Sequence, residues 1–248
     1  MDTRLNHSTL LVREVGHRYG NEAPFLFQGL SFKVCSGEVV GIIGGNGSGK
    51  TTLLNICSLL LRPTTGEVSL LGSSTGGDLG TWLARSFQHP PDVEGVPVWR
   101  YLTPIPAIGA RGKRGSWPWL LRCLLEDPLR DLLRSTRGQD ALDLQDAESL
   151  LRTTHIPPDL ALRPFDTLSL GARRIVDVVR ALRQGTELFI LDEPFANVAS
   201  HGVDGIIDLI CSARKAGAAG LITDHNTAAL SRCADRCLRL TGESLTEI

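Results

Sequence analysis

The sequence lacks a hydrophobic stretch that could cross a membrane, because no apolar run reaches the roughly 18–20 residues that a bilayer requires. Residues 1–7 also lack the apolar centre of a secretory signal peptide. We therefore expect a cytosolic chain, and any association with a membrane would have to come through a partner.

An excess of charge of either sign is also missing. The chain has 26 basic and 27 acidic residues, which gives a net charge of −1 when histidine is neutral. Proteins that coat nucleic acid are usually strongly basic, so the composition gives that class no support. The 248 residues, 42% of them hydrophobic, instead indicate a globular chain with an ample core, built as one large domain or two small ones.

Cysteine pairs of the CxxC kind are absent as well. The six cysteines are scattered, although Cys233 and Cys237 are close enough to share one face of a predicted helix. Zinc binding and a disulfide stay open as alternatives, but buried reduced thiols are the better interpretation.

Hydrophobic periodicity predicts an α/β chain with a small antiparallel sheet at one edge. Two short strands, at 10–15 and 30–34, are separated by a turn-forming stretch. The apolar run at 39–43 is typical of a buried central strand. A helix over 50–61, stopped by Pro63, and a strand over 67–71 follow. From 172 onwards, helices and strands alternate, with helices at 172–183, 203–216 and 226–235 and strands at 188–191, 221–223 and 237–240.

Residues 89 to about 166 have a different texture. This segment contains prolines at 90, 91, 97, 104 and 106, a basic glycine-rich loop over 109–115 and helical patterns at 119–125 and 142–151. We predict an α-helical subdomain inserted into the α/β core. The basic loop, with Trp117 and Trp119 after it, also suggests contact with a membrane or nucleic acid, but a solvated loop with one packed tryptophan is the favoured interpretation.

Residues 44–51, which we name the phosphate cradle, read GGNGSGKT and fit the pattern GxxxxGK[ST]. Glycines in this pattern let backbone N–H groups point inward around a phosphate, and the following helix presents its positive N-terminus to the same anion. Lys50 would supply a charge to the β- and γ-phosphates, and the Thr51 hydroxyl would ligate Mg²⁺. The alternative is a glycine-rich turn that happens to precede a lysine, but a position between an apolar strand and a helix argues against it.

A second motif, LFILDEP at 188–194, places two acids at the end of an apolar strand. Asp192 is expected at the carboxyl end of that strand, where proteins with a phosphate cradle hold Mg²⁺ through its water shell. Glu193 would point to the other side and polarise the water that attacks the γ-phosphate. An ordinary strand followed by a turn is the alternative, and the cradle upstream argues against it.

With both motifs in place, the sequence resembles the ABC ATPases over essentially its whole length. The signature loop of that family, LSGGQ, corresponds here to LSLGA at 168–172, and the continuation through 182 is similar to the RRRVEIARAL of family members. Ser169 and the Gly171 amide would lie at a helix N-terminus and bind the γ-phosphate of a nucleotide held by the opposite subunit. A serine N-cap without a ligand is the alternative.

The resemblance implies three further roles. Gln88 matches the glutamine that senses Mg²⁺ and the attacking water, and His225 matches the histidine that contacts the γ-phosphate. Tyr19 matches the aromatic residue that stacks on adenine, a contact worth about 1–3 kcal/mol that does not read the edges of the base. Taken together, the nucleotide-binding residues implied are Tyr19, Gly44, Asn46, Gly47, Ser48, Gly49, Lys50, Thr51, Thr52, Ser169 and Gly171, and those implied for the metal are Thr51, Gln88 and Asp192.

Two departures from the family pattern fall on the surface presented to a partner subunit. Leu170 stands where the signature loop usually has glycine, and a leucine disfavours a positive φ if the turn needs one. Ala199 stands where the loop after Glu193 usually has aspartate, and Asp204 lies too far along to substitute without a shifted loop. Within the family, the RSFQH stretch at 85–89 is similar to the ATPases of branched-chain amino acid importers, whereas 193–196 and 222–226 are equally similar to the lipopolysaccharide-export ATPase, so the direction of transport stays open.

These observations predict a single ABC ATPase domain over 1–248, with an α/β core at 1–88 and 171–248 and a helical subdomain at 89–170. We expect an ATPase that uses ATP and Mg²⁺ to energise a membrane permease from the cytoplasmic face, does not bind nucleic acid, and pairs with a different ATPase subunit. The alternatives are a non-transport ABC ATPase and a subunit that binds ATP mainly for regulation.

Overall fold

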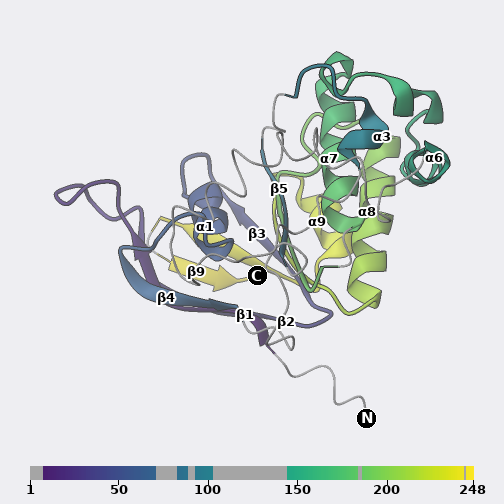
Figure 1. The fold of residues 1–248 in the computed structure, drawn as a ribbon. Coiled ribbons are helices and arrows are strands. Elements are labelled where there is room, and N and C mark those ends of the chain that lie inside the picture. The colour runs from purple at the N-terminus through teal and green to yellow at the C-terminus, as the bar shows by residue number, and fades with distance from the viewer. Residues whose placement is uncertain (1–7, 71–82, 89–92, 103–143, 184–185, 243) are drawn as a thin grey trace, which may run out of the picture.

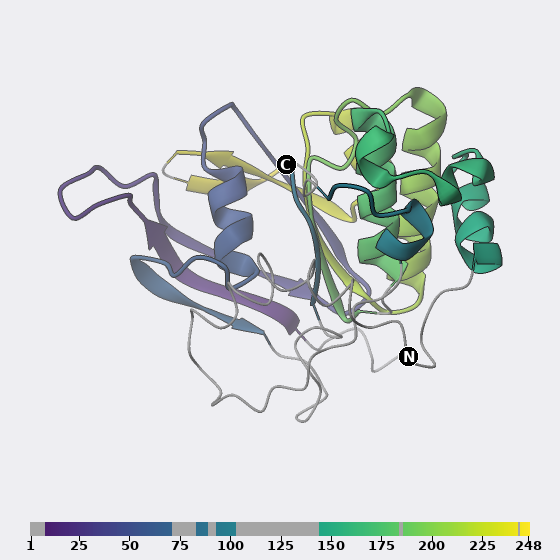
Figure 2. The ribbon, with the colours of Figure 1, turned by 45° about the horizontal axis from the view of Figure 1, so that its top comes forward.

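The computed structural model describes residues 8–70, 83–88, 93–102, 144–183, 186–242 and 244–248, and it arranges them in layers. In Figure 1, helix α1 lies between a three-stranded antiparallel sheet and a six-stranded sheet, and α7, α8 and α9 cover the other face of the larger sheet. The turned view in Figure 2 shows the same order of layers.

The six-stranded sheet has the order β5-β6-β7-β3-β8-β9. All neighbouring pairs are parallel except the last, in which β9 runs antiparallel to β8. Both faces of this sheet are covered, which explains why its inner strands read as continuous apolar runs. The bounds of its strands are Leu83–Ser86 for β5, Leu188–Asp192 for β6, Ala219–Thr223 for β7, Val39–Gly44 for β3, Arg236–Thr241 for β8 and Ser244–Glu247 for β9.

The smaller sheet has the order β2-β1-β4 and is antiparallel throughout. Its strands are β1 (Ser8–His17), β2 (Phe27–Cys35) and β4 (Thr65–Leu70). Helix α1 (Lys50–Cys57) packs its apolar side chains with those of β1 and β2 and with one face of the large sheet, including Ile190 of β6.

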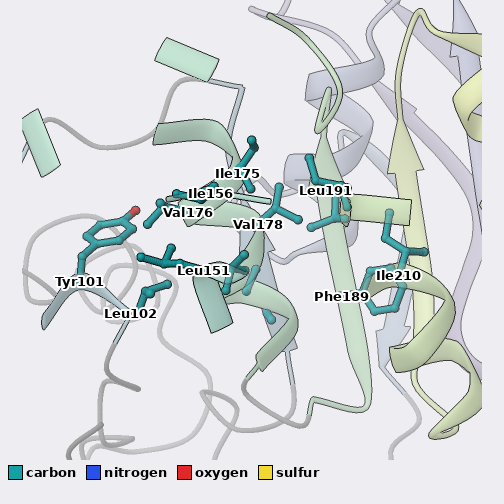
Figure 3. Packing of buried hydrophobic residues seen from close by; sticks show 14 of the residues in the cluster. Tyr101, Leu102, Leu151, Ile156, Ile175, Val176, Val178, Phe189, Leu191 and Ile210 are labelled. Atoms are coloured by element: carbon teal, nitrogen blue, oxygen red, sulfur yellow. The ribbon is translucent and has the colours of Figure 1, made fainter. Parts of the chain in front are cut away.

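On the opposite face, Phe189 and Leu191 of β6 join a second apolar cluster with α7 (Leu170–Arg183) and α8 (Ser200–Lys215). Figure 3 shows this cluster extending from Ile210 through Val178 to Tyr101 and Leu102. The alternation along β6 is what a strand with a helix layer on each side requires. Helix α9 (Thr227–Cys233) completes the layer.

The described part of 89–170 is helical or turn-like and lies outside α7. It comprises α3 (Val98–Tyr101), α6 (Leu144–Thr153) and two 3₁₀ turns, Pro158–Leu162 and Phe165–Thr167. The rings of Tyr101 and Phe165 stack with centroids 4.1 Å apart, and the Tyr101 hydroxyl donates to Asp177 Oδ1 of α7 at 2.6 Å. The predicted helix at 119–125 and the basic loop at 109–115 lie outside the described residues, and the boundaries of the subdomain stay a prediction.

Most of the predicted elements are confirmed, with four corrections. Helix α1 ends at Cys57 rather than near 61, because Leu59 takes a left-handed conformation (φ 60°) well before Pro63. Strands β5 and β9 were not predicted.

Cys233 and Cys237 do not share a helix face, since the first ends α9 and the second lies on β8. Cys57 and Cys233 are buried, but Cys35, Cys211 and Cys237 are partly exposed, so buried thiols describe only some of the cysteines; Cys123 lies outside the described residues.

Within the described ranges, no helix has both the length and the apolar character needed to cross a membrane.

Candidate active site at the carboxyl edge of the sheet

The phosphate cradle connects β3 to α1 and closes around its own lysine. Lys50 is 7% exposed, and its ammonium group donates to the backbone oxygens of Gly44 and Gly45, both at 2.9 Å. Gly49 has φ of 95°, and a Cβ there would come within 2.9 Å of the Leu26 and Phe27 side chains, so both its conformation and its surroundings require glycine. The loop therefore holds a buried cation among backbone groups, which suits it to receive an anion.

Two further observations fit the cradle to a phosphorylated ligand. The Ser48 hydroxyl is buried and has no hydrogen-bond partner, so it has unused capacity inside the loop. The Thr52 hydroxyl is bonded at 2.8 Å to the Tyr19 hydroxyl, which brings the predicted base-stacking residue to the first turn of α1. Tyr19 is 63% exposed as a residue, and its ring meets the ring of the buried His17 edge-on, with centroids 4.9 Å apart. Two other predicted nucleotide-binding residues of the cradle, Asn46 and Thr51, are exposed to solvent.

Asp192 lies at the end of β6, almost completely buried. Its Oδ1 accepts a hydrogen bond from the Thr223 hydroxyl at 2.7 Å, whereas its Oδ2 has no hydrogen-bond partner and lies 3.9 Å from Nη2 of Arg85. Burial lowers the pKa of Arg85 to about 10, although Asp192 opposes the shift, so Arg85 stays charged at neutral pH. A buried carboxylate with one oxygen that accepts no hydrogen bond is a suitable ligand for a hard cation such as Mg²⁺.

Glu193 follows directly and occupies a strained position, with φ of 51°. Its carboxylate joins two segments that are far apart in sequence: Gln88 Nε2 donates to Oε2 at 3.1 Å, and His225 Nε2 lies 3.2 Å from Oε1. Its backbone N–H donates to the Thr223 oxygen at 2.8 Å and fixes the turn to the neighbouring strand β7. The structure therefore brings the three predicted catalytic residues into direct contact.

Asp224 holds the loops around this trio in place, a role that the sequence did not reveal. Its carboxylate accepts backbone hydrogen bonds from Phe195 at 2.9 Å and Asn226 at 2.8 Å, so it ties the loop after Glu193 to the segment that carries His225. Burial raises the pKa of Asp224, and these backbone donors partly offset the shift. The resemblance assigns a role to the neighbouring His225 but none to Asp224, and the sequence alone does not show that this acid bonds to two backbone N–H groups.

A cavity of about 270 Å³ lies between the start of the cradle and the His225 segment, and its lining includes Gly44, Gly45, His225 and Arg239. Among the described residues, no cluster of three or more His, Cys, Asp or Glu could hold a metal ion unaided.

Ser169 and Gly171 lie apart from this group, at the start of α7. The Ser169 hydroxyl accepts from the Ala172 N–H at 3.3 Å, as an N-cap does. Leu170 is 49% exposed and is not among the residues with positive φ, so leucine causes no backbone conflict in this turn. A Cβ at Gly171 would come within 2.4 Å of the Asn197 backbone oxygen, so the signature turn packs directly against the loop that follows Glu193.

That loop leads into α8 without an acidic side chain to replace the usual aspartate. Ala199 is exposed and precedes the first residue of α8. Asp204 lies farther along α8 and pairs with Arg232 of α9 at 2.7 Å, so it is committed elsewhere.

Comparisons with known proteins agree on one family. A family model described as "ABC transporter" matches residues 27–196. The lipoprotein-releasing system ATP-binding protein LolD of Pseudomonas syringae pv. tomato is 33% identical over 97% of this chain and 98% of its own. A LolD protein of Caulobacter vibrioides is 29% identical (95% of this chain, 92% of its own), and the nickel import ATP-binding protein NikE of Brucella abortus is 29% identical (88% and 76%).

Solved structures agree in fold. A nucleotide-free ATP-binding cassette from an ABC transporter superposes with a TM-score of 0.71 at 24% identity, covering 97% of this chain and 91% of the other. A dimeric cassette in a post-hydrolysis state, bound to ADP and phosphate, gives 0.70 at 20% identity, covering 96% and 97%.

Proposed function

This chain belongs to the ABC transporter family as one of its ATP-hydrolysing subunits, and we propose that it works in a pair whose two nucleotide sites are unequal. Members of the family bind ATP with Mg²⁺, act with membrane permeases and form dimers of ATPase subunits. The proposal adds which residues of this chain bind and hydrolyse ATP, and what kind of subunit it pairs with.

The observation that carries the catalytic assignment is the contact of Glu193 with both Gln88 and His225. The Glu193 carboxylate lies 3.1 Å from the Gln88 amide and 3.2 Å from His225 Nε2, beside the carboxyl edge where the cradle begins. A carboxylate held from two sides is well placed to orient a water and accept its proton. Gln88 and His225 would then fix the direction of that carboxylate and remain in reach of the phosphate being transferred.

The cradle would bind the phosphates by exchanging partners. Lys50 would release the Gly44 and Gly45 oxygens and turn its charge to the β- and γ-phosphates. Thr51 and Asp192 would hold Mg²⁺, which when bound neutralises charge on the phosphate oxygens. Tyr19 would leave Thr52 and stack on the adenine ring.

Unequal sites are proposed because both departures from the family sequence lie on one surface. Leu170 and Ala199 are exposed and belong to the two loops that meet at Gly171 and Asn197. In a pair that shares its sites head to tail, this surface would face the cradle of the partner. The cradle of this chain, with Asp192, Glu193 and His225, would face an ordinary signature loop, making one fast site and one slow or binding-only site.

The proposal is tested by purifying the chain alone and together with the proteins that copurify from its native membranes. We expect little ATPase activity from the chain alone and brisk activity once a second, different ATPase subunit is present. Brisk turnover by the isolated chain, with homodimers trapped by Glu193→Gln, would contradict the heterodimer.

The same preparation tests the proposed position on the cytoplasmic face of the membrane, held there by a permease. Mass spectrometry should identify permease chains among the copurifying proteins. Ribosomal proteins in their place would instead favour the non-transport alternative. Steady turnover by a complex that carries Glu193→Gln in this chain alone would favour the regulatory alternative.

A further inference from the structure

Helix α7 carries a buried cation, Arg174, which donates hydrogen bonds to three backbone oxygens beside the catalytic residues. Arg174 is 2% exposed, and its Nη1 donates to the oxygens of Phe87 at 2.8 Å and Asp192 at 3.1 Å. Its Nη2 donates to the oxygen of Gln88. One guanidinium group therefore bonds to the peptide units that carry Gln88 and precede Glu193.

The charge of Arg174 has no direct carboxylate partner in these bonds, which is a costly arrangement for a buried group. Burial lowers the pKa of Arg174, and the nearby acids Asp177, Glu193 and Asp192 oppose the shift. If this position only had to fill space, an apolar side chain of the same length would do so without burying a charge. The planar fork of arginine, by contrast, can reach several carbonyls in fixed directions.

A second arginine of α7 extends the same contact along the chain. Arg180 pairs with Asp177 at 2.8 Å, and its Nη2 lies 3.4 Å from the oxygen of Arg85. Two arginines of α7 thus donate hydrogen bonds to backbone oxygens between residues 85 and 88, at the end of β5 and just after it. Figure 1 shows β5 and α7 as neighbours in this part of the molecule.

The other end of α7 is the signature turn, which packs against the Asn197 oxygen. A helix is stiff along its length, so a shift at its first turn is carried to side chains one turn farther on. Here Ser169 caps the helix and the first turn holds Gly171, both expected to face the nucleotide of the partner, and the next turn holds Arg174.

We propose that Arg174 is a positioning residue that couples the signature turn to Gln88 and Glu193, so that nucleotide bound against the turn adjusts this chain's own catalytic trio. The inference rests on the proposed function, because it requires a pair of subunits with shared sites. Arg174 touches neither nucleotide nor water in this role and acts only through the carbonyls that it holds.

The test compares Arg174→Met, Arg174→Lys and the control Arg236→Met in the purified transporter complex. Arg236 pairs with Glu38 at 2.6 Å, is largely buried, and lies on β8 away from the catalytic trio. ATP binding to the isolated chain is measured by calorimetry, and kcat and KM for ATP are measured in the complex. Backbone hydrogen exchange of 85–88 and 168–172 is followed with and without ATP.

We expect Arg174→Met to bind ATP within about threefold of wild type and to lose roughly 10–100-fold in kcat, since a misplacement of about 1 Å can cost that much. Added ATP should still change exchange at 168–172, but the change at 85–88 should disappear. Arg174→Lys, which can reach fewer carbonyls, should fall between, and Arg236→Met should match wild type.

Wild-type turnover by Arg174→Met, or an undiminished exchange response at 85–88, would overturn the coupling. If the methionine variant does not fold, by circular dichroism, the lysine variant decides, and full wild-type turnover from it would overturn the proposal. A wild-type complex that hydrolyses no ATP would instead overturn the proposed function, so the two failures are distinguishable.

Discussion

At the scale of single residues, two of the groups expected to bind phosphate and base already have partners within the chain. Lys50 bonds to the Gly44 and Gly45 oxygens, and Tyr19 bonds to Thr52. Binding ATP must therefore exchange these bonds rather than add to them. The net gain from each exchange is small, and affinity should respond measurably to removal of one internal bond.

Tyr19→Phe removes the hydroxyl that bonds to Thr52 and keeps the ring that would stack on adenine. We expect ATP to bind about 2–10-fold more tightly, because a net hydrogen bond is worth about 0.5–1.5 kcal/mol. Tyr19→Ala should instead weaken binding by the roughly 1–3 kcal/mol of one stacking contact. Calorimetry on both variants checks this, and equal losses from both would show that the hydroxyl contributes directly to binding.

Glu193→Gln should leave ATP binding intact and cut turnover by about 10²–10⁴-fold, the usual contribution of a general base. The amide would still contact Gln88 and His225 but could not accept a proton from water. Glu67→Gln, on the exposed face of β4, is the matched control and should turn over normally. ATPase rates, with size-exclusion chromatography to detect a trapped ATP-loaded pair, provide the measurement.

At the scale of elements, long patterns were predictable and short ones were not. Strand β3, the cradle and α1 were found from sequence because an apolar run, glycines and a helix follow one another directly. Strand β5 was missed because it has four residues and contains Arg85, whose partner Asp192 is supplied by a strand far along the chain. Strand β9 was missed because it has only four residues, most of them polar, and it lies at an edge of the sheet.

The candidate site divides in the same way. Glu193 was predicted from the strand and acid pair at 188–194, and Gln88 and His225 from the resemblance, although the contacts of Glu193 with the other two could not be read from either. Arg174 belongs to the stretch after the signature loop, and the resemblance implies no role for it, since only the folded chain shows that its guanidinium reaches three carbonyl oxygens. Residues whose partners are distant backbone groups leave no local pattern.

Close packing of helix α8 gives a prediction at this scale. A Cβ at Gly205 would come within 2.8 Å of the Thr154 Cα, which is backbone and cannot rotate away. Gly205→Ala should gain about 1 kcal/mol of helix propensity but lose about 1–3 kcal/mol to overpacking, so the free energy of unfolding should fall. Urea denaturation checks it, with Asp208→Ala at an exposed position of the same helix as control. Increased stability of Gly205→Ala would show that α8 and the chain at Thr154, just after α6, can separate without cost.

At the scale of the whole molecule, the expected nucleotide site joins both sheets. The cradle follows β3 of the six-stranded sheet, whereas Tyr19 follows β1 of the three-stranded sheet, with α1 between them. A ligand that touches all three layers should stabilise them together.

ATP should therefore raise the melting temperature of the chain. At a concentration 100 times the Kd, a ligand adds about 2.7 kcal/mol, which for a chain of this size corresponds to a shift of roughly 5–10 °C. Lys50→Ala should lose most of that shift, because its ammonium group is the cation at the centre of the cradle, whereas Lys33→Ala, on an exposed part of β2, should keep it. Scanning calorimetry at several ATP concentrations is the measurement. If ATP raises the melting temperature of Lys50→Ala as much as that of wild type, the cradle does not bind the phosphates as proposed.

The contact between Gly171 and the Asn197 oxygen has a consequence for how this sequence can evolve. Because the signature turn and the loop after Glu193 are in contact there, the effect of a mutation in one loop should depend on the sequence of the other. Leu170 and Ala199 lie on either side of this contact, so their effects should be epistatic. A genetic screen for faster ATPase variants should recover paired changes at these two positions more readily than either reversion alone.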